Sequence, residues 1–184
     1  ILVTNAYDAI LPTIRSRAVR IAFGALPPAE IAAALNERGV VDAAGIAALA
    51  DGSLGRAYAL AEEGLALRDD ALDLLTRLPE LSVEDIWARA EALGARPHAE
   101  RTAWISYVQM ALRDLLLLRE DGASNALCHI DRREMLTALL ARMADSDIHA
   151  LMDGARELTR RLAANVNPAL QAEAFLLRAR KQFV

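Results

Sequence analysis

Cysteine is almost absent from the chain, in which Cys128 stands alone. A single thiol excludes an internal disulfide framework and a zinc site built mainly from cysteines, and no metal site is predicted. No stretch approaches the run of about 20 apolar residues that spans a bilayer. The sequence also lacks the basic start and cleavage site of a secretory signal peptide, so we expect a cytoplasmic location and no membrane partner.

Aromatic residues and lysine are also scarce. Aromatics make up 4% of the 184 residues, and Lys181 is the only lysine. The net charge of −4 argues against a chain that binds nucleic acid through its overall charge. What is abundant is alanine and leucine, both strong helix formers, within a hydrophobic content of 54%. The composition therefore predicts a mainly α fold.

The first 22 residues carry the most distinctive pattern. The apolar run Ile1–Thr4 predicts a buried parallel strand whose carboxyl end opens onto a site. Pro12 then begins a new turn, and Arg15 and Arg17 follow with no acid nearby. Guanidinium groups without a nearby carboxylate are suited to bind a phosphate that is held by something else. Because a lone strand needs a sheet, we expect the chain to be the carboxyl-terminal portion of a longer protein.

From Pro27 onward the sequence shows helical periodicity broken by glycine, proline and short polar stretches. A small bundle of three helices comes first, with Ser53 as the amino-terminal cap of the third. A second bundle follows, in which Ser82 and Asp85 form a capping signal and Gly94 ends the same helix. The predicted helices cover residues 27–39, 43–51, 53–65, 71–78, 82–93, 97–120, 132–143, 147–163 and 168–180.

Several other residues invite a chemical role, but a structural one is favoured for each. Cys128-His129 lacks the spacing of a metal or nucleophile motif. The paired carboxylates Glu62-Glu63 and Asp69-Asp70 are interpreted as solvated or capping groups on helices. Trp104 and Tyr107 sit among leucines, so both are predicted to lie in the core.

Three segments resemble the delta-prime subunits of the bacterial DNA polymerase III clamp loader, within the AAA+ superfamily. They are ILVTN with LPTIRSR (residues 1–5 and 11–17), DGSLGRAYAL (51–60) and NVNPALQAEAFLLR (165–178). The resemblance implies that residues 1–22 end the nucleotide-binding domain, with its sensor-1 strand and SRC-like motif. It further implies a lid domain at 23–68 and a helical collar domain that oligomerises at 70–184.

The same resemblance implies a role for Arg17. In that family the arginine of Ser-Arg-Cys reaches across a subunit boundary to the ATP of the neighbouring gamma/tau subunit. Arg17, preceded by Ser16 and supported by Arg15, matches that position, while Ala18 replaces the cysteine. The alternative for Arg17 is a surface arginine paired to a helix end, and for Arg15 a salt bridge within its own subunit.

Two further positions concern the chain's own nucleotide site. Thr4 and Asn5 match sensor-1 positions and are expected to be structural in a subunit that does not hydrolyse ATP. In ATP-binding relatives the sensor-2 arginine occupies the position where this chain has Gly55, and Arg56 comes one residue later. One residue is a rotation of about 100° on a helix, so Arg56 is expected to miss a nucleotide and to have a domain-contact or surface role instead.

The implied function is a non-hydrolysing clamp-loader subunit with no enzyme activity alone, acting within the polymerase III holoenzyme. No cofactor is expected on this chain, since the ATP belongs to the neighbour. The implied partners are the gamma/tau and delta subunits, the sliding clamp indirectly, and primed DNA through the whole complex. The alternatives are the gamma/tau ATPase of the same loader and a helical adaptor unrelated to ATP.

Overall fold

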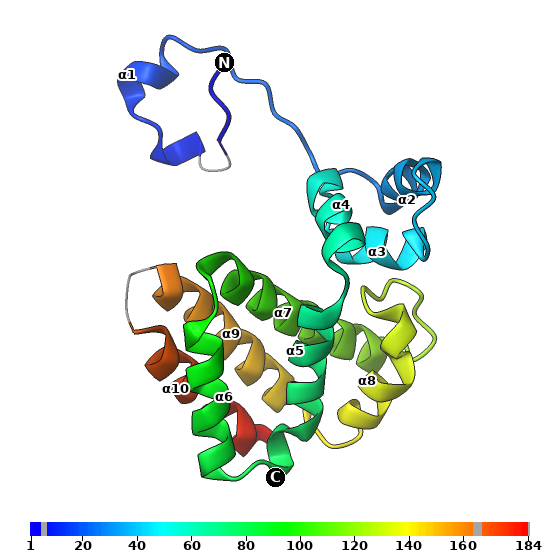
Figure 1. Ribbon diagram of the computed structural model, residues 1–184, viewed down its shortest axis with the longest axis vertical. Coiled ribbons are helices and arrows are strands. Elements are labelled where there is room, and N and C mark those ends of the chain that lie inside the picture. Colours follow the sequence, from blue (N-terminus) through cyan, green and yellow to red (C-terminus); the bar gives the residue numbers. More distant parts are fainter. Residues whose placement is uncertain (5–6, 164–166, 184) are drawn as a thin grey trace.

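The computed structural model describes residues 1–4, 7–163 and 167–183. These residues form ten α-helices and four short 3-10 helices, without a strand, so the prediction of a mainly α fold is confirmed. Figure 1 shows three parts along the chain: an amino-terminal segment (1–26), a three-helix unit (28–63) and a carboxyl-terminal bundle (66–183). Within the described residues, none of the helices has the length and apolar character to cross a bilayer.

The amino-terminal segment holds the 3-10 helix η1 (Tyr7–Ala9) and the four-residue helix α1 (Pro12–Arg15), which Pro12 begins as expected. The strand predicted over Ile1–Thr4 is wrong, because these residues have no regular structure and their side chains are exposed. A strand needs a hydrogen-bonding neighbour, and the described residues contain none. An extended stretch after residue 18 leads to the three-helix unit (Figure 1).

The three-helix unit consists of α2 (Pro28–Glu37), α3 (Ala43–Leu49) and α4 (Leu54–Glu63), close to the predicted helices. Ser53 caps α4 as predicted, since its Oγ accepts a hydrogen bond from the Arg56 backbone N–H at 3.3 Å. Each helix presents one apolar stripe to the other two. The fully buried side chains of this core include Ile31, Leu35, Leu49, Ala50 and Ala57.

The carboxyl-terminal bundle is built around α7 (His98–Glu120), which packs against α5 (Ala66–Arg77), α8 (Arg133–Leu140) and α9 (Asp145–Ala163). On the other side, α10 (Pro168–Arg180) packs against α6 (Val83–Ala95) and α9. The short helices η2 (Leu78–Glu80), η3 (Ile130–Arg132) and η4 (Lys181–Phe183) complete the bundle.

Two sequence predictions for this bundle are confirmed in detail. Trp104 and Tyr107 are buried, with Trp104 only 1% exposed. Ser82 and Asp85 form a reciprocal capping box, in which each side chain accepts the other residue's backbone N–H at 3.1 Å. The hydrogen bond from the Ser82 hydroxyl is the main cause that lowers the pKa of Asp85.

Several helix boundaries differ from the predictions, and two of the differences, in α5 and α6, have a clear physical cause. Helix α5 begins at Ala66 rather than residue 71, because the polar residues around Asp69 pair with arginines instead of breaking the helix. Gly94 was expected to end α6, but the helix continues to Ala95. Its role is close packing, since a Cβ at Gly94 would lie 2.7–2.8 Å from atoms of Ala169 at the start of α10.

We therefore predict that Gly94→Ala destabilises the protein, because backbone atoms of Ala169 would have to shift to accommodate the methyl group. The expected cost is about 1–3 kcal/mol in the free energy of unfolding. Gly55→Ala is the matched control: it also lies in a helix, but a Cβ there meets nothing within 4 Å. That change should stabilise the protein by up to about 1 kcal/mol. Urea unfolding of both variants measures the difference, and a Gly94→Ala protein as stable as the control would contradict the packing role.

Candidate functional site

The arginines of the amino-terminal segment do not share one environment. The guanidinium groups of Arg15 and Arg20 each lie over the ring of Tyr7, at 4.4 Å from its centroid. Arg15 also forms an exposed ion pair with Asp8 at 3.7 Å. The expectation that no acid lies near Arg15 is therefore wrong, because η1 brings Asp8 back toward α1. Of the two roles considered for Arg15, the structure shows the salt bridge within its own chain.

Arg17 differs from these neighbours. Its side chain is exposed, and its guanidinium makes no hydrogen bond, ion pair or ring contact with the residues that the structure describes. Its backbone N–H is bound to the Ile14 carbonyl at 3.1 Å, and the Ser16 hydroxyl donates to the Thr13 carbonyl at 3.2 Å. These local hydrogen bonds fix the backbone of the turn, and the side chain of Arg17 extends from it into solvent.

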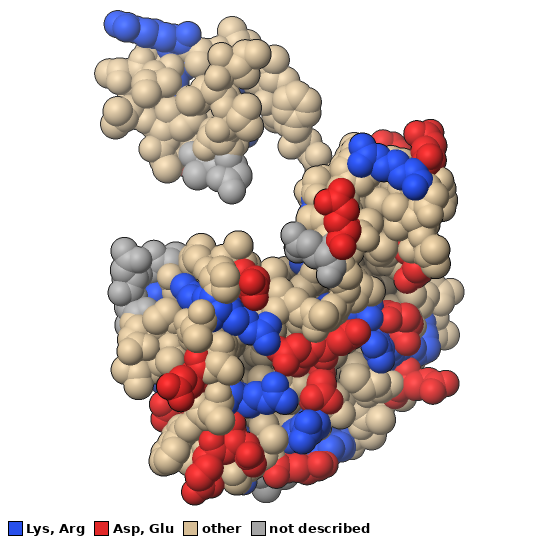
Figure 2. Space-filling model, viewed as in Figure 1, with Lys and Arg blue, Asp and Glu red and all other residues tan. Residues whose placement is uncertain are grey.

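Figure 2 shows how the charges are distributed on one face of the molecule. Acidic and basic side chains intermingle over the bundle, whereas the amino-terminal segment shows basic atoms at its outer end and no acidic atoms on this face. Of the two sensor-1-like positions, Thr4 is exposed, and Asn5 lies outside the described residues. Arg17 is therefore the arginine of this segment that is available to bind an anion of another molecule.

Arg56 makes a contact between the three-helix unit and the bundle. From the first turn of α4, its Nη2 donates to Ser106 Oγ on α7 at 3.2 Å. Its guanidinium also lies 5.3 Å from the centroid of the buried Tyr107 ring. This geometry is the domain contact considered for Arg56 in the sequence, and it engages the guanidinium within the chain.

Sequence reasoning missed a buried carboxylate, Asp114, on α7. Its side chain is fully buried and accepts hydrogen bonds from the Cys128 backbone N–H at 3.0 Å and from the His129 backbone N–H at 2.8 Å. His129, also fully buried, brings its Nδ1 to 2.8 Å from the same carboxylate. The signal was present, because Asp114 falls three residues after the core residue Ala111, on the apolar face of α7.

The Asp114–His129 pair has the outline of a catalytic dyad but lacks the nucleophile. Within the described residues, His129 Nε2 is buried with no hydrogen-bond partner. The neighbouring thiol of Cys128 instead accepts a hydrogen bond from Arg113 Nη1 at 3.0 Å. Burial is the main cause that raises the pKa of Cys128, which keeps it a neutral thiol at pH 7. The cluster therefore anchors the loop before η3 to α7.

Asp70 was interpreted as a solvated or capping group, and that interpretation is wrong. Its carboxylate is half-buried and accepts three hydrogen bonds, from Arg89 at 3.2 Å, from Arg96 at 2.8 Å and from the Trp104 indole N–H at 3.1 Å. These partners lie on α6, just after α6 and on α7. The carboxylate of Asp70, on α5, thus links α5 to α6 and α7.

A second network joins α5 to η3. Arg68 is only 3% exposed and pairs with Asp69 at 2.8 Å and with Asp131 at 2.9 Å. Arg132 completes the network by binding Asp69 at 2.9 Å. Both partners of the buried cation are carboxylates that reach solvent, so the charge of Arg68 is balanced without a ligand. No cluster of metal-ligating side chains occurs among the residues described.

Comparison with known proteins leaves the family open: no protein-family model matches the chain, and no curated protein matches it.

We predict that Asp114→Asn destabilises the bundle by about 2–5 kcal/mol, because the amide has one acceptor oxygen and its NH2 group would face backbone donors. Asp153→Asn, which changes an exposed carboxylate on α9, should alter stability by less than about 0.5 kcal/mol. Urea denaturation followed by circular dichroism measures both. Equal midpoints for the two variants would show that the buried carboxylate is not an anchor.

Proposed function

We propose that this chain is a non-hydrolysing clamp-loader subunit of the delta-prime type, in which Arg17 completes the ATP site of a neighbouring gamma/tau subunit. The observation that carries the proposal is the contrast among the arginines of one short segment. Arg15 and Arg20 are engaged with Tyr7, whereas Arg17 is exposed and unpaired among the described residues. The motif LPTIRSR adds the resemblance in sequence.

The chemistry suits a guanidinium held in this way. Phosphoryl transfer spreads negative charge over the transferred group and the leaving oxygens, and a permanently charged planar donor stabilises that charge. An arginine from a second subunit completes the site only when that subunit is seated. In other NTPases such an arginine raises the rate by about 10³–10⁵-fold. The hydrogen bonds of Ser16 and Arg17 within α1 and its turn would position this one.

The position of Arg56 favours delta-prime over the gamma/tau alternative. Gly55 occupies the place of the sensor-2 arginine and offers no side chain to a nucleotide. Arg56, one residue later, is engaged by Ser106 and Tyr107 of α7. A subunit whose sensor-2 region is committed to an internal contact is suited to a fixed, non-hydrolysing role.

In this proposal each of the three parts of the chain has its own role. The amino-terminal segment presents Arg17, the three-helix unit acts as the lid, and the carboxyl-terminal bundle acts as the collar that oligomerises with gamma/tau and delta. The contact of Arg56 with α7 would limit rotation of the lid against the collar. This chain would contact the sliding clamp indirectly and primed DNA through the whole complex. The complex would act in the cytoplasm.

The test is Arg17→Ala in a loader reconstituted with gamma/tau and delta. ATP hydrolysis stimulated by primed DNA and the clamp should fall by about tenfold or more at the site that Arg17 serves, while gel filtration shows intact assembly. Arg17→Lys should recover little, because lysine keeps the charge but loses the planar fork. Arg20→Ala is the matched control, since Arg20 lies over Tyr7 in the same segment.

Equal turnover for Arg17→Ala and the unmodified chain would falsify the trans-arginine role. It would favour the helical adaptor, the alternative without a link to ATP.

A further inference from the structure

The connector, residues 19–26, joins the amino-terminal segment to the three-helix unit (Figure 1). It has no regular structure. Among the described residues, the first backbone N–H after Ala18 to make a backbone hydrogen bond is that of Leu26, which donates to the Gly52 carbonyl at 2.9 Å. Gly52 lies in the turn between α3 and α4. This turn therefore holds the connector just before the chain enters α2.

Gly52 permits this contact for two reasons. Its φ is +76°, in the left-handed region that favours glycine. A Cβ at Gly52 would also lie 2.4 Å from the Cβ and 2.9 Å from the Cα of Ala25, which is closer than such atoms can approach. The turn must therefore lack a side chain at this position for Ala25 and Leu26 to lie against it. We call the contact of Gly52 with these two residues the connector clamp.

The connector clamp restrains the direction of the chain as well as its position. Ala25 packs against Gly52, and Leu26 is hydrogen-bonded to it. Pro27, next in the chain, is the N-cap of α2. A residue before proline is confined to extended backbone, and proline itself has a fixed φ. Because successive residues are held, the turn sets the direction in which the connector leaves toward Arg17.

The turn that carries Gly52 is also joined to the bundle. Ser53 Oγ accepts the backbone N–H of Arg56 at 3.3 Å. The guanidinium of Arg56 in turn donates to Ser106 on α7 at 3.2 Å. Leu26, Gly52 and Ser106 line one cleft of about 850 Å³ between the three-helix unit and the bundle. Contacts thus run from the connector through the turn to α7.

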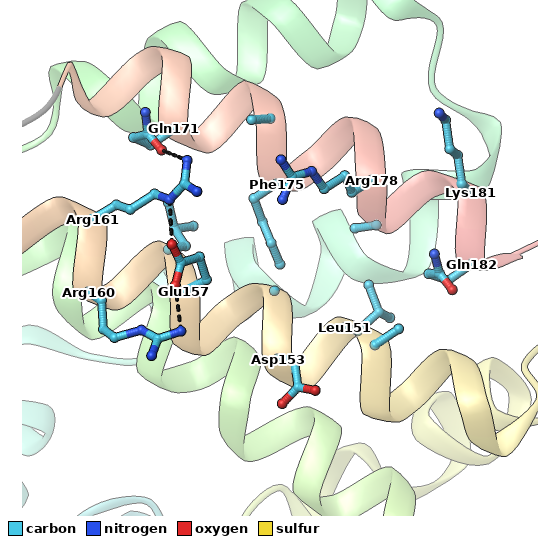
Figure 3. Close-up of a pocket in the computed structure, with 15 residues that line it drawn as sticks. Leu151, Asp153, Glu157, Arg160, Arg161, Gln171, Phe175, Arg178, Lys181 and Gln182 are labelled. Carbon is cyan, nitrogen blue, oxygen red and sulfur yellow. Dashed lines mark hydrogen bonds and ion pairs between the residues drawn. The ribbon is translucent and has the colours of Figure 1, made fainter.

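The helix that Arg56 contacts is itself fixed within the bundle, because α7 packs against α9 and α9 packs against α10. Figure 3 shows the junction of α9 and α10. There Glu157 accepts from Arg160 at 2.5 Å and from Arg161 at 2.6 Å, and Arg161 donates to Gln171 at 3.2 Å. Phe175 beneath them is a core side chain. The connector clamp is thus attached, through Arg56, to a packed body.

We propose that Gly52 is a positioning residue, which holds Ala25 and Leu26 and so sets where the amino-terminal segment places Arg17 relative to a neighbouring ATP site. The step from the connector clamp to ATP rests on the function proposed above, whereas the clamp itself is tested without ATP. A misplacement of about 1 Å caused far from the chemistry can cost about 100-fold in rate, so a contact remote from Arg17 can affect hydrolysis.

A glycine that serves only its own turn would behave differently, and Gly39 provides the comparison. Gly39 follows α2 and has a φ of +71°, but a Cβ there meets nothing within 4 Å. Alanine imposes similar backbone strain at both positions, and it collides with the connector at Gly52 alone of the two. Gly39→Ala is therefore the matched control for Gly52→Ala.

The first experiment measures amide hydrogen exchange by NMR on the full chain. In Gly52→Ala the Leu26 N–H should exchange faster by about tenfold or more, because the hydrogen bond that protects it is lost. The N–H of Ala57, bound to the Ser53 carbonyl at 3.0 Å, should keep its protection, which shows that the three-helix unit stays folded. Gly39→Ala should leave the exchange of Leu26 unchanged.

Ala25→Val is a second variant, which crowds the connector clamp from the connector side without straining the turn. It decides the test if Gly52→Ala fails to fold, and it too should speed the exchange of Leu26. Unchanged exchange of Leu26 in the folded variants would overturn the connector clamp.

The second experiment measures ATP hydrolysis by the reconstituted loader at saturating ATP. Gly52→Ala should lower the rate stimulated by primed DNA by about tenfold, with assembly intact, and Gly39→Ala should not. The double variant Arg17→Ala/Gly52→Ala should be no slower than Arg17→Ala alone, because Gly52 acts through Arg17.

The two experiments separate the inference from the proposed function. The positioning role is overturned if Gly52→Ala hydrolyses ATP at the unmodified rate while Arg17→Ala is slow, or if the double variant is markedly slower than Arg17→Ala. If Arg17→Ala itself keeps the full rate, the proposed function fails and the role toward ATP fails with it. The exchange of Leu26 then still decides whether the connector clamp exists.

Discussion

The carboxylate of Asp70 is the interaction on which the arrangement of the bundle depends. It accepts hydrogen bonds from Arg89, Arg96 and Trp104, and so draws α5, α6 and α7 toward one point. Charge-assisted hydrogen bonds of this kind are directional, whereas apolar packing alone allows helices to slide and rotate. Trp104 fixes the rotation of α7, and that rotation in turn sets which residues α7 offers to the rest of the chain.

Two consequences follow from the position of α7. Ser106 and Tyr107 face Arg56, and the guanidinium of Arg56 contacts both residues, so it links the three-helix unit to the bundle. Asp114 lies on the buried face two turns further along and holds the loop of Cys128 and His129 by three hydrogen bonds. One helix thus serves both the core of the bundle and its contact with the neighbouring unit.

The arginines of the chain divide by what surrounds them. Arg68 is buried and neutralised by Asp69 and Asp131, and Arg56 is committed to a contact between the units. Arg17 and Arg178 are exposed and lack an acidic partner among the described residues. Since an exposed arginine gains little from its own chain, these are the cations available to another molecule. The proposed role of Arg17 rests on this distinction.

The sequence by itself determined the helices, because apolar periodicity and local caps such as Ser53 and the Ser82–Asp85 box act within a few residues. It also identified Trp104 and Tyr107 as core, and it singled out Arg17 from the motif around it. The strand predicted over Ile1–Thr4 failed because a strand is defined by a neighbour, which no local pattern can provide.

Only the tertiary structure decided which charged residues have partners. Arg68 and Asp131 are 63 residues apart in sequence, and Arg56 and Ser106 are 50 apart, so neither pairing leaves a local signal. The same holds for Gly94, whose role depends on Ala169 in another helix. Helix formation is local, whereas the pairing of charges and the close approach of helices depend on contacts between distant segments.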